Sequence, residues 1–153
     1  MLECVILIGL QASGKSMFFR ERFAATHDHV SKDLLRRIRQ PDRRQQELLR
    51  ASLSAGRSVV VDNTHASAAS RAAVIVVARE HGARITGYYF DTAPADALRR
   101  NRLREGAARV PDVAIFATLK RLEPPSLDEG FDELRFVRLD EQRRAFKISE
   151  AHP

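Results

Sequence analysis

The amino-acid sequence predicts an α/β fold, a parallel sheet flanked by helices on both faces. Two observations predict it. Short apolar runs of strand length alternate with segments of helical period along the chain, and polar turns with acids or glycine follow several of these runs. In such sheets ligands bind outside the carboxyl ends of the strands, so the residues after each strand are the candidates for a functional site.

The expected elements follow from apolar periodicity and from the proline, glycine and capping residues that mark where helices and strands begin and end. Strands are expected at residues 1–8, around Val30, and at 58–62, 84–90 and 133–139. Helices are expected over residues 15–25, 32–40, 41–55, 66–81, from Pro94 onward, and over 111–122. Residues 1–153 are expected to be one domain, with 140–153 forming either a short hairpin or a frayed tail.

Composition limits the class of protein. Apolar residues make up 44% and charged residues 30% of the 153 residues, as in soluble globular domains. The apolar run at the start is too short to span a bilayer, and Glu3 does not suit a signal peptide. The single cysteine, Cys4, is expected to be a buried structural thiol. We therefore expect a cytoplasmic protein without a membrane association, and the sequence leaves its oligomeric state open.

The net charge of +6 arises mainly from arginine. Arginine suits bidentate contact with phosphate, so the excess favours a polyanionic partner such as a nucleotide or nucleic acid. A solvated arginine-rich surface explains the same excess, and composition alone does not separate the two.

The stretch from Val5 to Ser16 is the most specific feature of the chain. An apolar run leads into Gly9, and Gly14-Lys15-Ser16 completes the phosphate-loop pattern G-x-x-x-x-G-K-[ST]. Successive backbone N–H groups in such a loop, together with the following helix N-terminus, surround a triphosphate. We expect Lys15 to contact the β- and γ-phosphates of ATP and Ser16 to bind Mg²⁺. The expected nucleotide-binding residues of the loop are Gly9, Gln11, Ala12, Ser13, Gly14, Lys15, Ser16 and Met17.

The segment from Ser31 to Arg36 follows the second expected strand. Asp33 lies in the first turn of the next helix, where an acid commonly complements the helix dipole. Alternatively, its carboxylate faces the γ-phosphate and accepts the proton of an attacking hydroxyl. Arg36 lies one turn later, which suits an acceptor that carries both a hydroxyl and a phosphate.

Asp62, Asn63 and Thr64 follow three valines at the end of another strand. An acid in this position fits a ligand of Mg²⁺ or of its water, while an ordinary strand-end turn explains it equally well. Asn63 and Thr64 can donate hydrogen bonds to a phosphate. His65 is assigned no role, and His27 and His29 offer too few ligands for a zinc site.

Arg100 and Arg104 are four residues apart, so on one continuous helix they share a face. A glycine-containing loop follows them. We interpret this segment as a lid whose arginines close on the donor phosphates, although an exposed basic helix end accounts for the same residues.

Taken together, these segments resemble the kinase domain of polynucleotide 5′-hydroxyl kinases, both the phage type and the domain of the animal DNA-repair enzyme. The resemblance is collinear from Cys4 to about Leu139. It rests on residues 9–16, Lys32-Asp33, residues 61–64, residues 68–71, Asn101-Arg102 with Arg104-Glu105, Val110-Pro111, and the run from Pro124 to Phe131. The last run is unrelated to phosphate binding and so gives almost independent support.

The resemblance implies an adenylate-kinase-like P-loop NTPase fold with an arginine-bearing lid. It implies transfer of the ATP γ-phosphate to a 5′-hydroxyl of DNA or RNA, with Mg²⁺ as the metal. Lys15, Asp33 as general base, and Arg104 would be catalytic; Arg100 and Arg104 would bind the donor. Arg36 would contact an acceptor phosphate, and Asp62, Asn63 and Thr64 would line the acceptor site.

This chain departs from the family pattern on the acceptor side. The family's Asn-Arg before the base is Ser31-Lys32, and the Asn after Asp-Asn-Thr is His65. Two alternatives therefore stay open: a P-loop kinase for a small metabolite, nucleoside, antibiotic or aminoacyl-tRNA, and a non-catalytic ATP-binding module.

Overall fold

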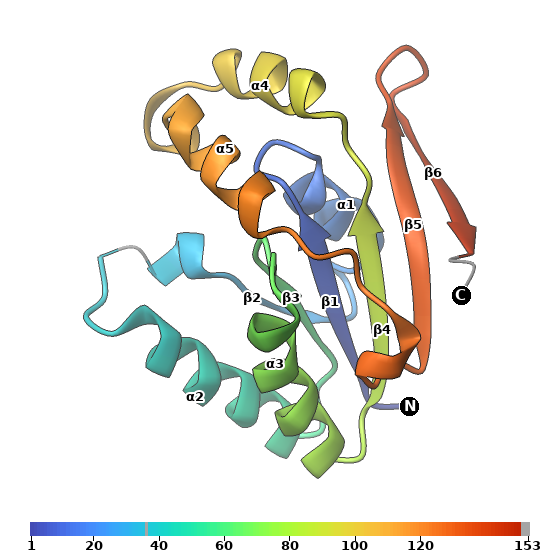
Figure 1. Cartoon of the computed structure of the whole chain (residues 1–153). Coiled ribbons are helices and arrows are strands. Elements are labelled where there is room, and N and C mark those ends of the chain that lie inside the picture. Colours follow the sequence, from blue (N-terminus) through green and yellow to red (C-terminus); the bar gives the residue numbers. More distant parts are fainter. Residues whose placement is uncertain (36, 151–153) are drawn as a thin grey trace.

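The structure, a computed structural model, describes residues 1–35 and 37–150. Six strands form one sheet in the order β2-β3-β1-β4-β5-β6. Their bounds are β1 Glu3–Gly9, β2 Asp28–Val30, β3 Val59–Asp62, β4 Arg84–Phe90, β5 Glu133–Asp140 and β6 Ala145–Glu150. The first five strands pair in parallel, and β6 pairs antiparallel with β5 (Figure 1). The predicted fold class is thereby confirmed.

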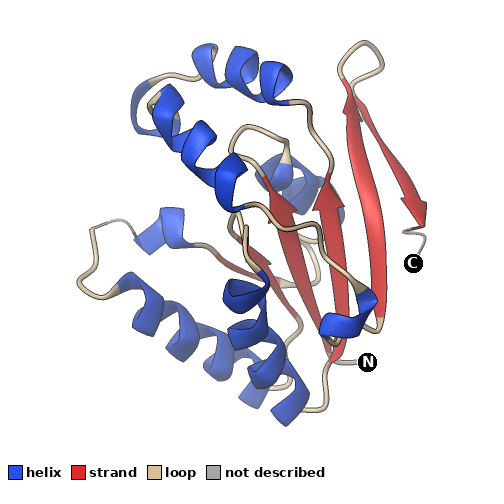
Figure 2. Cartoon of the chain, viewed as in Figure 1, coloured by secondary structure: helices blue, strands red, loops and turns tan. Residues whose placement is uncertain are grey.

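Helices pack on both faces of the sheet (Figure 2). The helices are α1 Lys15–Arg22, α2 Pro41–Ser54, α3 Ala68–Glu80, α4 Pro94–Arg102 and α5 Asp112–Arg121, with single 3-10 turns η1 Lys32–Leu35, η2 Gly106–Ala108 and η3 Leu127–Glu129. No helix in residues 1–35 and 37–150 has the length and apolar character needed to cross a membrane.

Alternating side chains of β1 divide the core into two layers. Cys4, Ile6 and Ile8 pack with apolar residues of α2 and α3, whereas Val5 and Leu7 pack with phenylalanines of α1. This period of two is what a strand buried on both faces requires. Burial raises the pKa of the Cys4 thiol to about 12, so this cysteine is an unreactive core residue.

Helices α4 and α5 lie over the carboxyl ends of the strands, where they contact each other and Leu10 (Figure 1). They form a small core of their own around Ala97 and Ile115. The phosphate loop, which links β1 to α1, thus lies beneath a separate helical layer. Any cavity at this end of the sheet is bounded by three groups of elements: the loop, the segments after β2 and β3, and this layer.

One expected element is wrong. The helix expected over residues 32–40 is only the turn η1, and residues 37–40 are not helical. Proline explains the difference, because its ring disfavours a helical conformation in the residue before it. Gln40 accordingly adopts a left-handed φ of 57°, and α2 begins afresh at Pro41.

Candidate active site

The phosphate loop has the backbone needed to surround an anion. Gly14 caps α1 with a φ of 98°, and Ala12 also has a positive φ of 62°. At Gly9 an added Cβ would lie 2.9 Å from Cβ of Phe90, so only glycine fits there. The first turn of α1 contains no acid, which leaves the positive end of its dipole uncompensated. The loop is therefore shaped and charged for phosphate.

Lys15 is buried against its own loop. Its Nζ donates to the carbonyl oxygens of Gly9 at 2.9 Å and Leu10 at 2.7 Å. Burial lowers the pKa of this ammonium to about 8; the charge of Arg104 lowers it further, while Asp62 and Asp33 oppose the shift. An ammonium that is costly to hold charged gains strongly from an added anion, as expected of a phosphate-binding lysine.

Asp62 is almost fully buried at the end of β3 and accepts two hydrogen bonds on one oxygen. Ser16 Oγ and His29 Nε2 each lie 2.9 Å from Asp62 Oδ2. Burial alone would raise the pKa of Asp62, but the hydrogen bond from His29, the charge of Lys15 and the hydrogen bond from Ser16 hold it below its ordinary value. Asp62 is thus an ionised carboxylate directly beside the loop.

These groups fit a bound Mg²⁺. The Ser16 hydroxyl donates its hydrogen bond to Asp62 and so keeps its oxygen lone pairs available, and the carboxylate lies next to it. Hydroxyl, carboxylate and phosphate oxygens are the ligands that Mg²⁺ prefers. Ser16 and Asp62 are therefore the residues that would hold the metal, as the sequence suggests.

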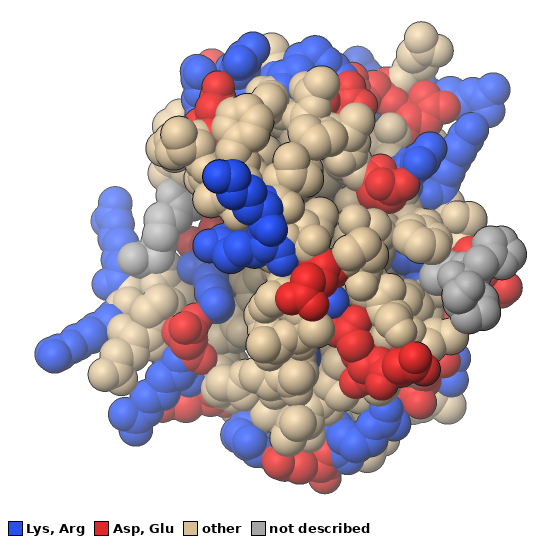
Figure 3. All heavy atoms as spheres, in the orientation of Figure 1, with Lys and Arg blue, Asp and Glu red and all other residues tan. Residues whose placement is uncertain are grey.

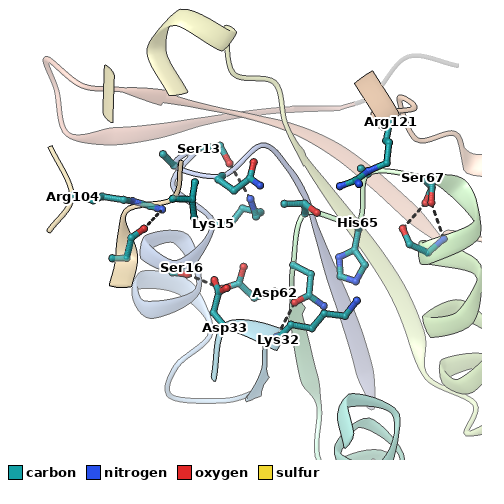
Figure 4. A pocket seen from close by; sticks show the side chains of 18 of the residues that line it. Ser13, Lys15, Ser16, Lys32, Asp33, Asp62, His65, Ser67, Arg104 and Arg121 are labelled. Carbon is teal, nitrogen blue, oxygen red and sulfur yellow. Dashed lines mark hydrogen bonds between the residues drawn. The ribbon is translucent and has the colours of Figure 1, made fainter. Parts of the chain in front are cut away.

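A single cavity of about 750 Å³ joins the predicted donor and acceptor residues (Figure 4). Its predicted lining residues are Gln11, Ala12, Ser13, Lys15, Ser16, Asp33, Asp62, Asn63, Thr64 and Arg104. They come from the loop, η1, the segment after β3 and the segment after α4. These segments are distant in the sequence and meet outside the carboxyl ends of the strands, as expected for a parallel sheet.

Asn63 connects the segments of the acceptor side. Its Oδ1 accepts from the backbone N–H of Lys32 at 2.9 Å, and its Nδ2 donates to Gln45 Oε1 on α2. These bonds fix the turn that carries Asp33, whose exposed carboxylate lines the cavity. The side chain of Asn63 is therefore engaged in holding the turn that precedes α2.

Four predicted residues are not part of the cavity lining. Gly9 and Gly14 shape the loop through their backbone, and the Met17 side chain is 42% exposed. Arg100 donates to Glu141, in the turn after β5, instead of reaching the cavity. Helix α4 ends at Arg102, so Arg100 and Arg104 do not share one helical face. Arg36 lies outside the described residues.

Sequence reasoning missed several residues at this site. His29 contacts Asp62 from β2, and the signal that could have found it is the parallel pairing of β2 with β3. Arg121 lines the cavity from the end of α5, and its side chain points into the pocket in Figure 4. Arg20 also lines it, from the first helix. Among the described residues, neither arginine lies within ion-pair distance of a carboxylate.

His65 has a structural role in this arrangement. Its Nδ1 donates to the carbonyl oxygen of Leu7 at 2.8 Å, which links the end of β3 to β1. Burial lowers the pKa of His65 to about 4, with the neighbouring cations Lys15 and Lys32 adding to the shift. The imidazole is neutral near pH 7 and adds no charge to the cavity.

An ion pair between a buried arginine and a partly buried glutamate supports the segment that carries the predicted acceptor residues. Arg71 of α3 is fully buried, and its guanidinium donates to both carboxylate oxygens of Glu129, at 2.7 and 3.1 Å. The same guanidinium donates to the carbonyl of His65 at 2.8 Å. Glu129 belongs to the run Pro124–Phe131 that resembles the kinase family. That run therefore fixes the backbone just after Thr64 instead of touching the cavity.

Comparison with known proteins identifies the family of this chain. Residues 4–125 match the AAA domain family (AAA_33), and the chain belongs to that family. Within it, the loop and the sheet define a P-loop kinase domain.

The relatives differ in what their names say they act on. Over 142 residues the chain is 26% identical to a bifunctional polynucleotide phosphatase/kinase of Schizosaccharomyces pombe, covering 88% of this chain and 33% of that protein. The chain thus spans about a third of the length of this curated relative. Two solved structures share the fold. A fungal RNA kinase is 15% identical with a TM-score of 0.66, and the match covers 92% of this chain and 39% of that one. A gluconokinase from Sinorhizobium meliloti is 18% identical with a TM-score of 0.62, and the match covers 89% of this chain and 82% of that one.

Proposed function

We propose that this protein is an ATP-dependent kinase that transfers the γ-phosphate to a 5′-hydroxyl of DNA or RNA. The observation that carries the proposal is the single cavity in which the phosphate loop, Asp33 and the segment Asp62–Thr64 face one another. The 26% identity to a polynucleotide phosphatase/kinase, over 88% of the chain, supports this choice of acceptor.

On the donor side, the loop amides and Lys15 would hold the phosphates of ATP. Ser16 and Asp62 would hold Mg²⁺, which neutralises charge on the phosphate oxygens when bound. Arg104 lines the same cavity from the segment after α4 and is free of carboxylate partners among the described residues. A guanidinium in this position stabilises the charge of the transferring phosphoryl group.

On the acceptor side, Asp33 would act as general base. The 5′-oxygen forms a bond to the γ-phosphorus, the bond from that phosphorus to the bridging oxygen breaks, and ADP leaves with the electron pair. The hydroxyl proton passes to the Asp33 carboxylate, which is exposed and ready to exchange it with solvent.

The charge around the cavity suits a polyanionic acceptor. Lys32 and Arg121 line its acceptor side, and Figure 3 shows lysine and arginine side chains gathered over the central hollow of this face. The phosphate that follows the nucleoside bearing the 5′-hydroxyl would meet positive charge there.

Transfer of labelled phosphate from ATP to oligonucleotides tests the proposal. We expect labelling of 5′-hydroxyl DNA or RNA and none of the same strand with a 5′-phosphate. Asp33→Asn should reduce the rate by roughly 10²-fold or more. The matched control is Asp128→Asn, which removes an exposed carboxylate from η3 outside the cavity.

Three outcomes would contradict parts of the proposal. An unchanged rate in Asp33→Asn would remove the base assignment. Labelling of neither DNA nor RNA would remove the polynucleotide acceptor. ATP binding without transfer to any acceptor tried would leave a nucleotide-binding module.

A second candidate is a kinase for a small hydroxyl compound. The cavity volume of about 750 Å³ falls within the range of small-molecule sites, which favours it. Including nucleosides and sugars as acceptors in the same labelling experiment separates the two, because a polynucleotide kinase gains rate from phosphates beyond the first nucleotide.

A further inference from the structure

Two histidines on one short segment make similar contacts, each with a carboxylate and with a phenylalanine ring. His29 Nε2 lies 2.9 Å from Asp62 Oδ2, and its ring stacks on Phe19 of α1 with centroids 4.0 Å apart and planes 15° apart. His27 Nε2 lies 2.8 Å from Glu3 Oε1, and its ring meets Phe23 of the same first-helix region edge-on. Only the first pair is next to the phosphate loop.

The direction of the hydrogen bond at His29 is fixed by its partner. An ionised carboxylate only accepts, so Nε2 carries the proton and donates it. Ser16 Oγ donates to the same oxygen, Oδ2, at 2.9 Å. Two donors from different elements therefore determine how the Asp62 carboxylate is turned, and among the described residues its other oxygen, Oδ1, accepts no hydrogen bond.

The imidazole of His29 is itself held in place. Phe19 lies three residues after Ser16 on α1, so the ring is stacked on the same helix that carries the metal-binding hydroxyl. The strand below it is fixed by the pairing of His29 with Val60 in β3, two residues before Asp62. His29 does not line the cavity, so it acts only through Asp62.

We propose that His29 is a positioning residue that orients Asp62 for the Mg²⁺ of a bound nucleotide. With Oδ2 accepting from His29 and Ser16, Oδ1 of Asp62 and the lone pairs of the Ser16 oxygen would be left to hold the ion or its water. Partners that hydrogen-bond metal-site carboxylates in this way typically change metal affinity 10–100-fold when removed. The inference rests on the donor half of the proposed function and is independent of the acceptor.

Substitutions at His29 separate the N–H group from the ring. His29→Phe keeps a ring on Phe19 but removes the donor. His29→Gln places an amide N–H close to the position of Nε2, and His29→Asn is too short to reach Asp62. ATP binding by calorimetry, with Mg²⁺ and with a chelator, gives the readout.

We expect His29→Phe and His29→Asn to weaken Mg²⁺-dependent ATP binding about tenfold or more, while ATP binding in chelator changes less than twofold. His29→Gln should recover most of the loss. His27→Phe is the matched control: it removes an equivalent carboxylate bond, to Glu3, and should leave both affinities unchanged. Thermal melting of each variant verifies folding, and the Gln and Asn pair suffices if the Phe variant does not fold.

Three results would overturn the inference. These are wild-type Mg²⁺ dependence in both His29→Phe and His29→Asn, an equal loss in His29→Gln, or an equal loss in the presence of chelator. If wild-type protein shows no Mg²⁺-dependent ATP binding, the inference and the donor half of the proposed function both fail. Normal ATP binding without phosphate transfer to oligonucleotides overturns only the proposed acceptor.

Discussion

The two halves of the cavity are built in different ways. In the proposed donor half, the phosphate-binding part is one continuous segment, residues 9–16, within which Lys15 bonds to Gly9 and Leu10. The acceptor half is assembled from separate segments: Asp33 on η1, Asn63 and Thr64 after β3, and Arg121 at the end of α5. Long-range contacts, such as Arg71 with Glu129, hold these segments in place. The phosphate loop is therefore a local structure, whereas the proposed acceptor half depends on the whole fold.

The largest effect is expected from a substitution that impairs the donor half alone. Lys15→Met should lower kcat/KM for phosphate transfer by about 10²–10³-fold, because it removes a buried charge that would stabilise the transferring phosphate. Binding of an oligonucleotide without ATP, measured by fluorescence anisotropy, should be unchanged. A comparable loss of oligonucleotide binding would contradict the division into two halves.

Removing the ion pair that supports the acceptor half should impair acceptor binding more than ATP binding. Glu129→Gln leaves the guanidinium of Arg71 buried without its charged partner, which should cost about 3 kcal/mol in the free energy of unfolding. Urea denaturation measures this loss. Below the unfolding transition, the acceptor KM should rise more than the KM for ATP. The control is Glu123→Gln, an exposed acid without an ion pair among the described residues, and a selective loss of ATP affinity in Glu129→Gln would contradict the model.

A smaller effect is expected at Arg121. Arg121→Ala should raise the KM of an oligonucleotide about threefold to tenfold, through the loss of one phosphate contact, and leave the KM for ATP unchanged. The slope of log affinity against log salt should fall by about 0.7 for a single-stranded acceptor. Lys120→Ala changes an adjacent cation that does not line the cavity and should alter neither quantity. An unchanged slope in Arg121→Ala would place this residue outside the acceptor path.

The smallest expected effect is a pH dependence confined to the donor half. The pKa of Lys15 is about 8, below its ordinary 10.5, so ATP affinity should fall by about half between pH 7 and pH 8 as the ammonium loses its proton. Over the range from about 8 to 10.5 the unfolded chain binds more protons at this site than the folded chain. The contribution of Lys15 to the stability of the free protein should therefore increase with pH there, relative to Lys15→Met. Acceptor affinity following the same pH curve would contradict the assignment.

The difference between the halves also explains what the sequence could predict. The phosphate loop is contiguous, so its residue types and spacing specify it without knowledge of the fold. Alternation of strands and helices predicted the sheet, whose carboxyl ends then indicated Asp33 and Asp62. The contact of His29 with Asp62 spans 33 residues of sequence, and no local pattern records it.

Local geometry accounts for the predictions that differed. Arg100 and Arg104 share a face only if the helix continues, and α4 ends between them. The helix expected over residues 32–40 was wrong because Pro41 restricts Gln40. Both differences concern where a helix ends, which depends on one or two residues rather than on the periodicity of a long segment.

The packing of β6 has a consequence for how the surroundings of the phosphate loop are assembled. Phe146, near the end of the described chain, meets the ring of Phe18 edge-on, and an added Cβ at Gly14 would lie 3.0 Å from its Cε1. Gly14 and Phe18 therefore pack against a strand that follows every other described strand in the sequence. The final packing around the loop would depend on the pairing of β6 with β5, so this contact joins the two ends of the described sheet into one folding unit.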